Sequence, residues 1–183
     1  MSATYQRPPK GSATLLILAL GSGGCAAAGQ QHFALPTSYE VHVSTDFGPD
    51  ATATALAALS EWESRVAVEF RIVMTDDACP GGSTSQGLES CFEIVPQSGL
   101  AVVQDCGGDD EVVGCTYVTG GVVHIAADDS PGAPDQSHVL LHEMGHALGL
   151  QHVQNPTALM YPTLDGAAHV ESLDIQQYEA LRR

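Results

Sequence analysis

Alternation of hydrophobic and polar positions marks the strands of this chain. In residues 39–46 (YEVHVSTD) and 68–74 (VEFRIVM), most apolar side chains recur at every second position, as in a strand with one buried face. Gly120 and Gly121 separate two runs rich in valine, which predicts a hairpin. The complete set of predicted strands is 39–46, 68–74, 92–95, 100–104, 112–118 and 122–127.

Three helices are predicted where apolar residues recur every three or four positions or where good helix formers accumulate. Leu56, Leu59 and Trp62 follow this spacing in an alanine-rich stretch, and Asp50 is a candidate N-cap for it. Ser172 is a candidate cap for the last helix. The predicted helices are 51–65, 135–150 and 171–181. With no internal repeat visible, the pattern predicts one domain in which a strand-rich part precedes a helical part.

The N-terminus reads as an export signal. Arg7 and Lys10 precede an apolar run at 13–20, and small residues follow. A cut before Cys25 would resemble a bacterial lipoprotein, with Cys25 lipidated, whereas Ala26-Ala27-Ala28 fits ordinary secretion. We favour lipidation, because Cys25 otherwise has no clear purpose, and we expect an outer-membrane, cell-surface or secreted protein. A short buried helix is the alternative. The predicted organisation is a signal at 1–24, a tether at 25–38 and a single domain at 39–183.

Composition and charge narrow the possible partners. The 183 residues are 44% hydrophobic, which is enough for a sizeable core. Six basic and 22 acidic residues give a net charge of −16, which argues against binding to nucleic acid or to an anionic membrane surface. We therefore expect no nucleic-acid partner, and we expect a monomer.

Four cysteines follow Cys25, and an exported chain favours disulfides between them. Four cysteines allow three pairings. We favour the local pairing, because it closes two short loops that cannot pack a core of their own. Free buried thiols and a zinc site built from all four cysteines are the alternatives, although no C-x-x-C spacing is present. The favoured pairs are Cys79 with Cys91 and Cys106 with Cys115.

One segment carries the candidate chemistry. His142 and His146 are four residues apart, so on a helix both imidazoles point to one metal ion. Glu143 lies beside them as a candidate general base. Gly149 allows a sharp turn after the helix, which lets His152 return as a third ligand. Three protein ligands leave one zinc position open, as in catalytic sites.

This segment resembles the elongated zinc motif of the metzincins. Downstream, Met160, Tyr161 and Pro162 resemble the Met-turn of the matrixin branch, the matrix metalloproteinase type, and Asp174 and Tyr178 resemble the start of its final helix. The resemblance implies an α+β fold: a twisted, mostly parallel sheet with one antiparallel edge strand, two backing helices and a small C-terminal subdomain. It also implies a zinc endopeptidase, in which a zinc-bound water attacks the peptide bond.

By the same resemblance, individual residues acquire roles. His142, His146 and His152 would hold one zinc ion, Glu143 would be the general base, and Met160 would lie below the metal. The family's cysteine-switch motif is absent. Since His124 is the only histidine between Asp76 and Asp135, we predict no second zinc.

Other expectations concern calcium, substrate and rival functions. Asp109-Asp110-Glu111 and Asp128-Asp129 are candidate calcium ligands. A polypeptide substrate would lie along the edge strand at 112–118. We expect His138 to be solvated rather than to support the zinc ligands, and His124 to be structural. The rivals are a non-catalytic zinc module and an enzyme for a non-protein amide or for one dedicated partner protein.

Overall fold

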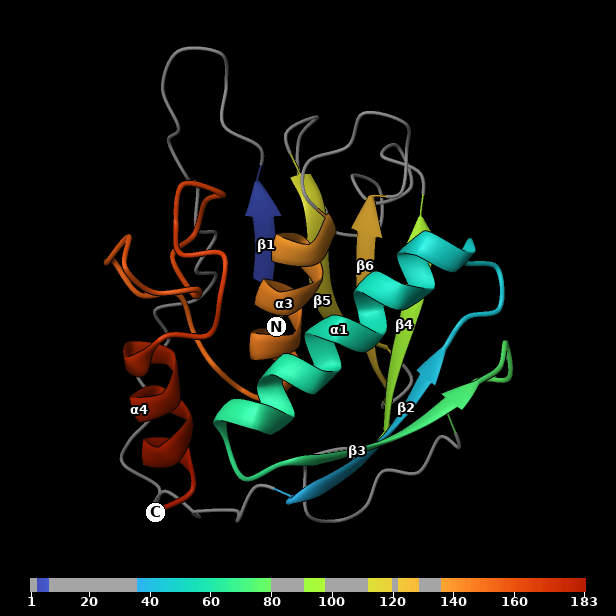
Figure 1. The fold of residues 1–183 in the computed structure, drawn as a ribbon, viewed down its shortest axis with the longest axis horizontal. Coiled ribbons are helices and arrows are strands. Elements are labelled where there is room, and N and C mark those ends of the chain that lie inside the picture. Colours follow the sequence, from blue (N-terminus) through green and yellow to red (C-terminus); the bar gives the residue numbers. More distant parts are fainter. Residues whose placement is uncertain (1–2, 7–35, 80–90, 98–111, 120–121, 129–135) are drawn as a thin grey trace.

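The computed structural model describes residues 3–6, 36–79, 91–97, 112–119, 122–128 and 136–183. Helices α1 (Pro49–Arg65) and α3 (Gln136–Ala147) lie together on one face of a twisted sheet, and α4 (Ser172–Leu181) lies in the C-terminal part of the chain (Figure 1). Among the described residues, no helix has the length and apolar character needed to cross a bilayer.

The sheet has the order β1-β5-β6-β4-β2-β3. Strands β3, β2, β4 and β6 are parallel, whereas β5 is antiparallel to both of its neighbours. The α+β prediction, with its mostly parallel sheet, is confirmed. The bounds are β1 (Ala3–Gln6), β2 (Ser38–Val43), β3 (Glu69–Met74), β4 (Cys91–Gln97), β5 (Val112–Thr119) and β6 (Val122–Asp128).

One detail of the sheet differs from the expectation. We expected the antiparallel strand to form an edge, but Ala3–Gln6 pairs along the outer side of β5, with Ala3 opposite Thr116. These residues fall within the predicted signal, whose boundaries stay a prediction. The strand expected at 100–104 lies outside the described residues.

The helix starts also differ from the predicted caps. Helix α1 begins at Pro49, because proline suits the first helical position, and Gly48 is its N-cap; Asp50 therefore lies in the first turn. Helix α4 is capped by Glu171 instead of Ser172. The Glu171 side chain accepts from the backbone of Asp174, and the Asp174 side chain accepts from the backbone of Glu171, so both orphan amides have partners.

The core lies between the helices and the inner face of the sheet. Trp62 is fully buried, and its indole nitrogen donates to the carbonyl of Leu141 at 2.9 Å, which ties α1 to α3. On the sheet side, the rings of Tyr39 and Phe92 stack with centroids 4.6 Å apart. The sheet positions that alternate with these, such as Glu40 on β2, belong to the opposite, polar face.

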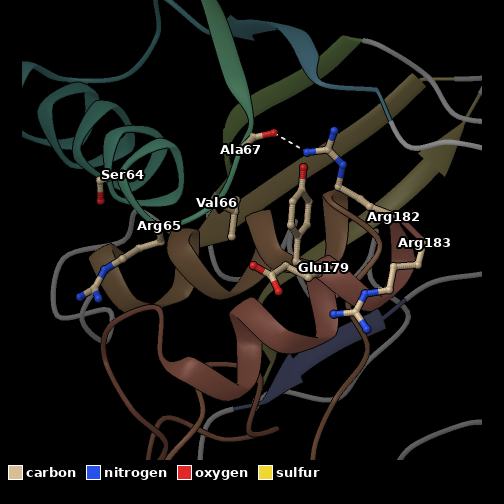
Figure 2. A pocket seen from close by; sticks show the side chains of 8 residues that line it. Ser64, Arg65, Val66, Ala67, Glu179, Arg182 and Arg183 are labelled. Atoms are coloured by element: carbon tan, nitrogen blue, oxygen red, sulfur yellow. Dashed lines mark hydrogen bonds between the residues drawn. The ribbon is translucent and has the colours of Figure 1, made fainter.

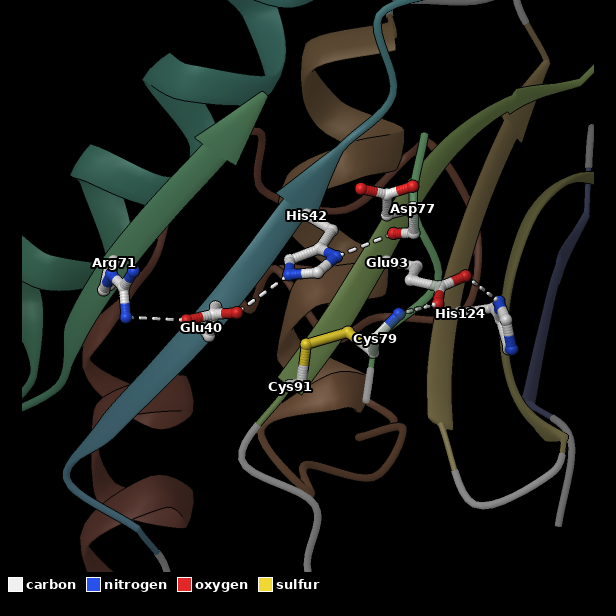
Figure 3. The surroundings of a disulfide bond; sticks show 8 residues. All are labelled: Glu40, His42, Arg71, Asp77, Cys79, Cys91, Glu93 and His124. Carbon is white, nitrogen blue, oxygen red and sulfur yellow. Dashed lines mark hydrogen bonds and ion pairs between the residues drawn. A yellow bond between two sulfur atoms is a disulfide. The ribbon is translucent and has the colours of Figure 1, made fainter. Parts of the chain in front are cut away.

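The predicted disulfide between Cys79 and Cys91 is confirmed, on the polar face of the sheet (Figure 3). Cys115 is buried and is also disulfide-bonded. Its predicted partner Cys106 lies outside the described residues, so that pairing stays a prediction. The disulfides agree with export into an oxidising compartment.

Replacing Trp62 with phenylalanine tests the contact between α1 and α3. The variant loses the indole donor and leaves a small cavity, so we expect the free energy of unfolding to fall by about 1–3 kcal/mol. Urea denaturation measures this loss. Ile72→Thr, at an exposed position of β3, is the control and should change stability by no more than about 0.5 kcal/mol. Equal effects of the two substitutions would show that the contact contributes little.

Candidate metal centre

Helix α3 presents two histidines one turn apart. His142 is fully buried, and His146 lies at the partly covered end of the helix. Their ring centroids are 4.9 Å apart, and the rings are nearly perpendicular. The four-residue spacing therefore places both imidazoles on the same side of α3, as the sequence predicted.

The turn after α3 brings the third histidine back. Gly149 has φ of 93°, a conformation that glycine adopts without steric cost. The amide of Gly149 donates to His146 O and the amide of Leu150 donates to Gly145 O, both at 2.9 Å. These two bonds form a Schellman motif, which ends the helix and reverses the chain. The Nε2 atom of His152 consequently lies 3.1 Å from the Nε2 atoms of both His142 and His146.

Hydrogen bonds of the Nδ1 atoms determine which nitrogen of His142 and of His146 carries the hydrogen. His142 Nδ1 lies 2.8 Å from Leu159 O, and His146 Nδ1 lies 2.9 Å from Leu150 O. Because a carbonyl oxygen only accepts, each Nδ1 must carry the hydrogen. The Nε2 lone pairs therefore point inward, in the arrangement found when a second hydrogen bond orients a metal-binding histidine.

The geometry fits zinc. His152 Nε2 lies 3.1 Å from each of the other two Nε2 atoms, and their facing lone pairs repel one another unless a cation lies between them. Three nitrogens at zinc-bond distance in a tetrahedron are about 3.3 Å apart, which is close to the observed spacing. Burial holds the pKa of His142 well below its usual range and, together with the nearby His146, lowers the pKa of His152 to about 3. These rings are thus neutral at pH 7, as metal ligands must be.

Glu143 is buried next to the ligands. Its Oε2 lies 2.9 Å from the hydroxyl of Thr116 on β5, and that hydroxyl also donates to the carbonyl of Glu143 at 2.7 Å. Among the described residues, Oε1 is buried and has no hydrogen-bond partner. Burial raises the pKa of Glu143 to about 8, and the bonds from Thr116 oppose this shift. A cation at the histidines would favour the ionised carboxylate.

Met160 packs directly under the helix. A Cβ atom on Gly145 would overlap Met160 Sδ, so a larger residue between the two histidine turns would force the Met160 side chain to shift. Asp174, at the start of α4, accepts from the amides of Leu159 and Met160 at 2.9 and 3.0 Å. Because it holds these two amides, the Asp174 carboxylate also positions the carbonyl of Leu159, which accepts the hydrogen of His142 Nδ1.

Helix α4 also steadies the segment before the third ligand. The side chain of Gln177 accepts from the backbone of Gln151 and donates to it, at 2.6 and 3.1 Å. The amide of Val153 donates to Met160 O at 2.9 Å. Both neighbours of His152 are therefore hydrogen-bonded: Gln151 to α4 directly, and Val153 to Met160, which α4 holds through Asp174.

The structure brings together His142, Glu143, His146, His152 and Met160, and the rest of the predicted Met-turn, Tyr161 and Pro162, continues from Met160. The expectation for His138 was wrong: it is only 4% exposed, because it faces the core one turn before His142. His124 pairs with Glu93 at 3.0 Å.

The remaining candidates from the sequence fall outside what the structure describes. Cys25, Asp109-Asp110-Glu111 and Asp129 lie outside the described residues, and the Asp128 side chain is not described. Calcium binding there stays a prediction.

Two supporting residues did not emerge from the sequence. Gly145 had a visible signal, since an isolated glycine inside a helix usually has a packing reason. Thr116 had none, because only the three-dimensional fold brings β5 to Glu143.

A separate pocket of about 440 Å³ lies between the end of α1 and α4 and is lined by none of the three histidines (Figure 2). Arg65, Arg182 and Arg183 line it. Arg182 donates to the carbonyl of Ala67 at 2.6 Å. All three arginines stand at helix C-termini, where a positive charge offsets the helix dipole, so their clustering has a structural explanation.

A family model described as Matrixin matches residues 36–182. A stretch of 24 residues is 67% identical to "Probable matrix metalloproteinase 095L" of Invertebrate iridescent virus 3, over 13% of this chain and 7% of the viral protein. Among solved structures, high choriolytic enzyme 1, a hatching enzyme zinc-protease from Oryzias latipes, matches with 18% identity and a TM-score of 0.37, over 63% of this chain and 44% of that one. Each match thus spans less than half of the relative.

Loss of one histidine tests the metal centre. We expect the oxidised protein to bind one zinc ion per chain and His146→Ala to lose it, because two remaining ligands cannot close the site. Elemental analysis after gel filtration measures the ratio. His169→Ala, which removes an exposed histidine paired with Glu61, is the control and should keep its zinc. Two zinc ions in the oxidised wild-type protein would contradict the prediction of a single site.

Proposed function

The chain belongs to the matrixin family, and from this premise we propose that it is a zinc-dependent endopeptidase acting on extended polypeptides. The observation that carries the proposal is the set of three converging Nε2 atoms beside a buried carboxylate. His142, His146 and His152 would hold the zinc ion. When bound, zinc would polarise the scissile carbonyl and lower the pKa of water.

Glu143 would move the proton. Thr116 occupies its Oε2, which leaves Oε1 free to accept a hydrogen from the attacking water. As the water oxygen bonds to the carbonyl carbon, the carboxylate takes up the proton. It then delivers that proton to the amide nitrogen as the carbon–nitrogen bond breaks. One carboxylate thus serves as base and then as acid, and no net proton is gained or lost by the enzyme.

Strand β5 would hold the substrate. The hydrogen bond from Thr116 to Glu143 joins this strand to the general base, so a peptide paired along β5 would pass close to the site. Ala3–Gln6 occupies the outer side of β5 in the described structure. Because these residues belong to the predicted signal, its removal would free that side for a substrate strand.

Export is the second part of the proposal. A disulfide between Cys79 and Cys91 supports maturation outside the cytoplasm. We further propose a lipid anchor at Cys25, in an outer-membrane or cell-surface protein, with simple secretion as the alternative.

The rival functions make different demands. A non-catalytic zinc module has no use for a buried carboxylate beside the metal ligands. An enzyme for a non-protein amide or for one partner protein keeps the same residues, so only the substrate distinguishes it. Incubation of the mature protein with a peptide library, with and without a chelator, separates these possibilities.

Glu143→Gln tests the role of the carboxylate. The variant keeps the shape but cannot accept the proton, so we expect the peptidase rate to fall by a factor of about 10²–10⁴. Zinc content should not change, since Glu143 is not a ligand. Glu179→Gln, at an exposed position of α4, should retain full activity. Near-normal activity of Glu143→Gln would exclude Glu143 as the general base, whatever the metal content.

Cys25→Ser tests the anchor. If Cys25 is lipidated, the wild-type protein partitions with membranes, and the variant should move to the soluble fraction with unchanged specific activity. A single acyl chain anchors only marginally, so the natural anchor should carry more than one. Mass spectrometry of the mature N-terminus decides between the routes: an unmodified start at Gly29 would exclude lipidation and support secretion.

A further inference from the structure

A second group of metal-ligating side chains lies on the polar face of the sheet, away from the histidines of α3. A ring nitrogen of His42 and the sulfur atoms of Cys79 and Cys91 all lie within 4.8 Å of one another. The three residues are 7%, 3% and 9% exposed. In Figure 3 the disulfide lies near His42, over strand β4, to which Cys91 belongs. No step of the proposed peptidase reaction uses these residues.

We propose that reduction of the Cys79–Cys91 disulfide converts this group into a binding site for a thiophilic divalent cation such as zinc or cadmium. A dithiol reductant supplies two electrons and two protons, which break the sulfur–sulfur bond and leave two thiols. The cation then displaces both thiol protons and the Nε2 proton of His42, and it binds two thiolates. His42 provides a nitrogen ligand, and the Glu40 carboxylate completes four-coordination.

Contacts that do not involve the disulfide hold the cysteines in place. The backbone amide of Cys79 donates to Glu93 Oε1 at 2.6 Å. Cys91 belongs to β4, where it pairs opposite Glu40 of β2. The Cα atoms of the two cysteines are 6.0 Å apart. Reduction therefore breaks one covalent bond and leaves the segments that carry both sulfurs attached to the sheet.

The histidine is oriented as a ligand. His42 Nδ1 lies 2.8 Å from the carbonyl of Asp77, which only accepts, so Nδ1 carries a hydrogen. Nε2 lies 2.8 Å from Glu40 Oε1 and donates a hydrogen to it, so a metal would take the place of that hydrogen between the ring and the carboxylate. A histidine whose second nitrogen is fixed by a carbonyl is the usual arrangement in metal sites, and His142 and His146 show the same pattern.

Cations have a route to this group. A pocket of about 240 Å³ borders it and is lined by His42, Asp76, Asp77 and Glu93, among other residues. Carboxylates in such a hollow raise the local concentration of cations. Arg71 is 76% exposed and is paired with the other Glu40 oxygen at 2.9 Å, so it need not enter the site.

The disulfide and the metal exclude each other, because the same sulfur electron pairs serve both. The oxidised chain would bind zinc only at the histidines of α3, and the reduced chain would gain a second, chemically distinct site. Only the second site contains thiolates, which gives it a spectroscopic signature independent of peptidase activity.

Cadmium titration of the reduced protein tests the proposal. Reduction with a phosphine also frees Cys115 from its disulfide, so the reading is the part of the ultraviolet thiolate-to-metal charge-transfer band that depends on Cys91. On adding cadmium, this part should saturate at one ion per chain in the reduced protein and be absent from the oxidised protein. His42→Gln should weaken binding about 10-fold or more. His169→Gln, an exposed histidine elsewhere, is the matched control and should bind like the wild type. Cys91→Ser should lose this part of the band.

Three outcomes would overturn the proposal. The first is the absence of a charge-transfer band although thiol titration shows that Cys79 and Cys91 are reduced. The second is an unchanged cadmium affinity in His42→Gln. The third is a full band in Cys91→Ser, which would assign the band to the other cysteines. If reduction unfolds the chain, cadmium should restore the far-ultraviolet circular dichroism of the wild type but not of His42→Gln. Failure to restore it would also overturn the proposal.

Discussion

The structure depends on one electrostatic constraint: three imidazole lone pairs converge, with His152 Nε2 only 3.1 Å from the Nε2 atoms of both His142 and His146. Without a cation this arrangement is repulsive, so the surrounding protein must hold the rings in position. Two backbone carbonyls do so, one from Leu150 in the turn that ends α3 and one from Leu159 before Met160. The turn after α3 and the segment before Met160 place these two carbonyls.

Side-chain packing connects the helix that carries His142 and His146 to the core. Met160 lies against Gly145 so closely that a larger residue at that position would displace its side chain, and Trp62 ties the same helix to α1. Strand β5 approaches from the sheet, where Thr116 holds one oxygen of Glu143. Two of the three ligands and the carboxylate thus lie on one helix that is packed into the core, which suits a site whose parts must stay aligned.

The sequence predicted the parts of this arrangement that depend on local spacing. The histidines four residues apart, the glycine after the helix and the alternating strands all follow from short-range geometry. Thr116, the burial of His138 and the pairing of Ala3–Gln6 with β5 depend on which segments meet in space, and no local pattern encodes that. The cap of α4 was misplaced by one residue because Glu171 caps with its side chain where serine is the commoner choice.

The carboxylate of Asp174 contributes to two structures at once. It caps the start of α4, and it holds the amides of Leu159 and Met160. The start of the last helix and the segment that carries the Leu159 carbonyl are therefore linked through one side chain. During synthesis, a chain that has not yet released α4 from the ribosome lacks the group that positions the Met-turn. In such a nascent chain the metal centre would be incomplete, so the order of elements delays its assembly until α4 has been synthesised.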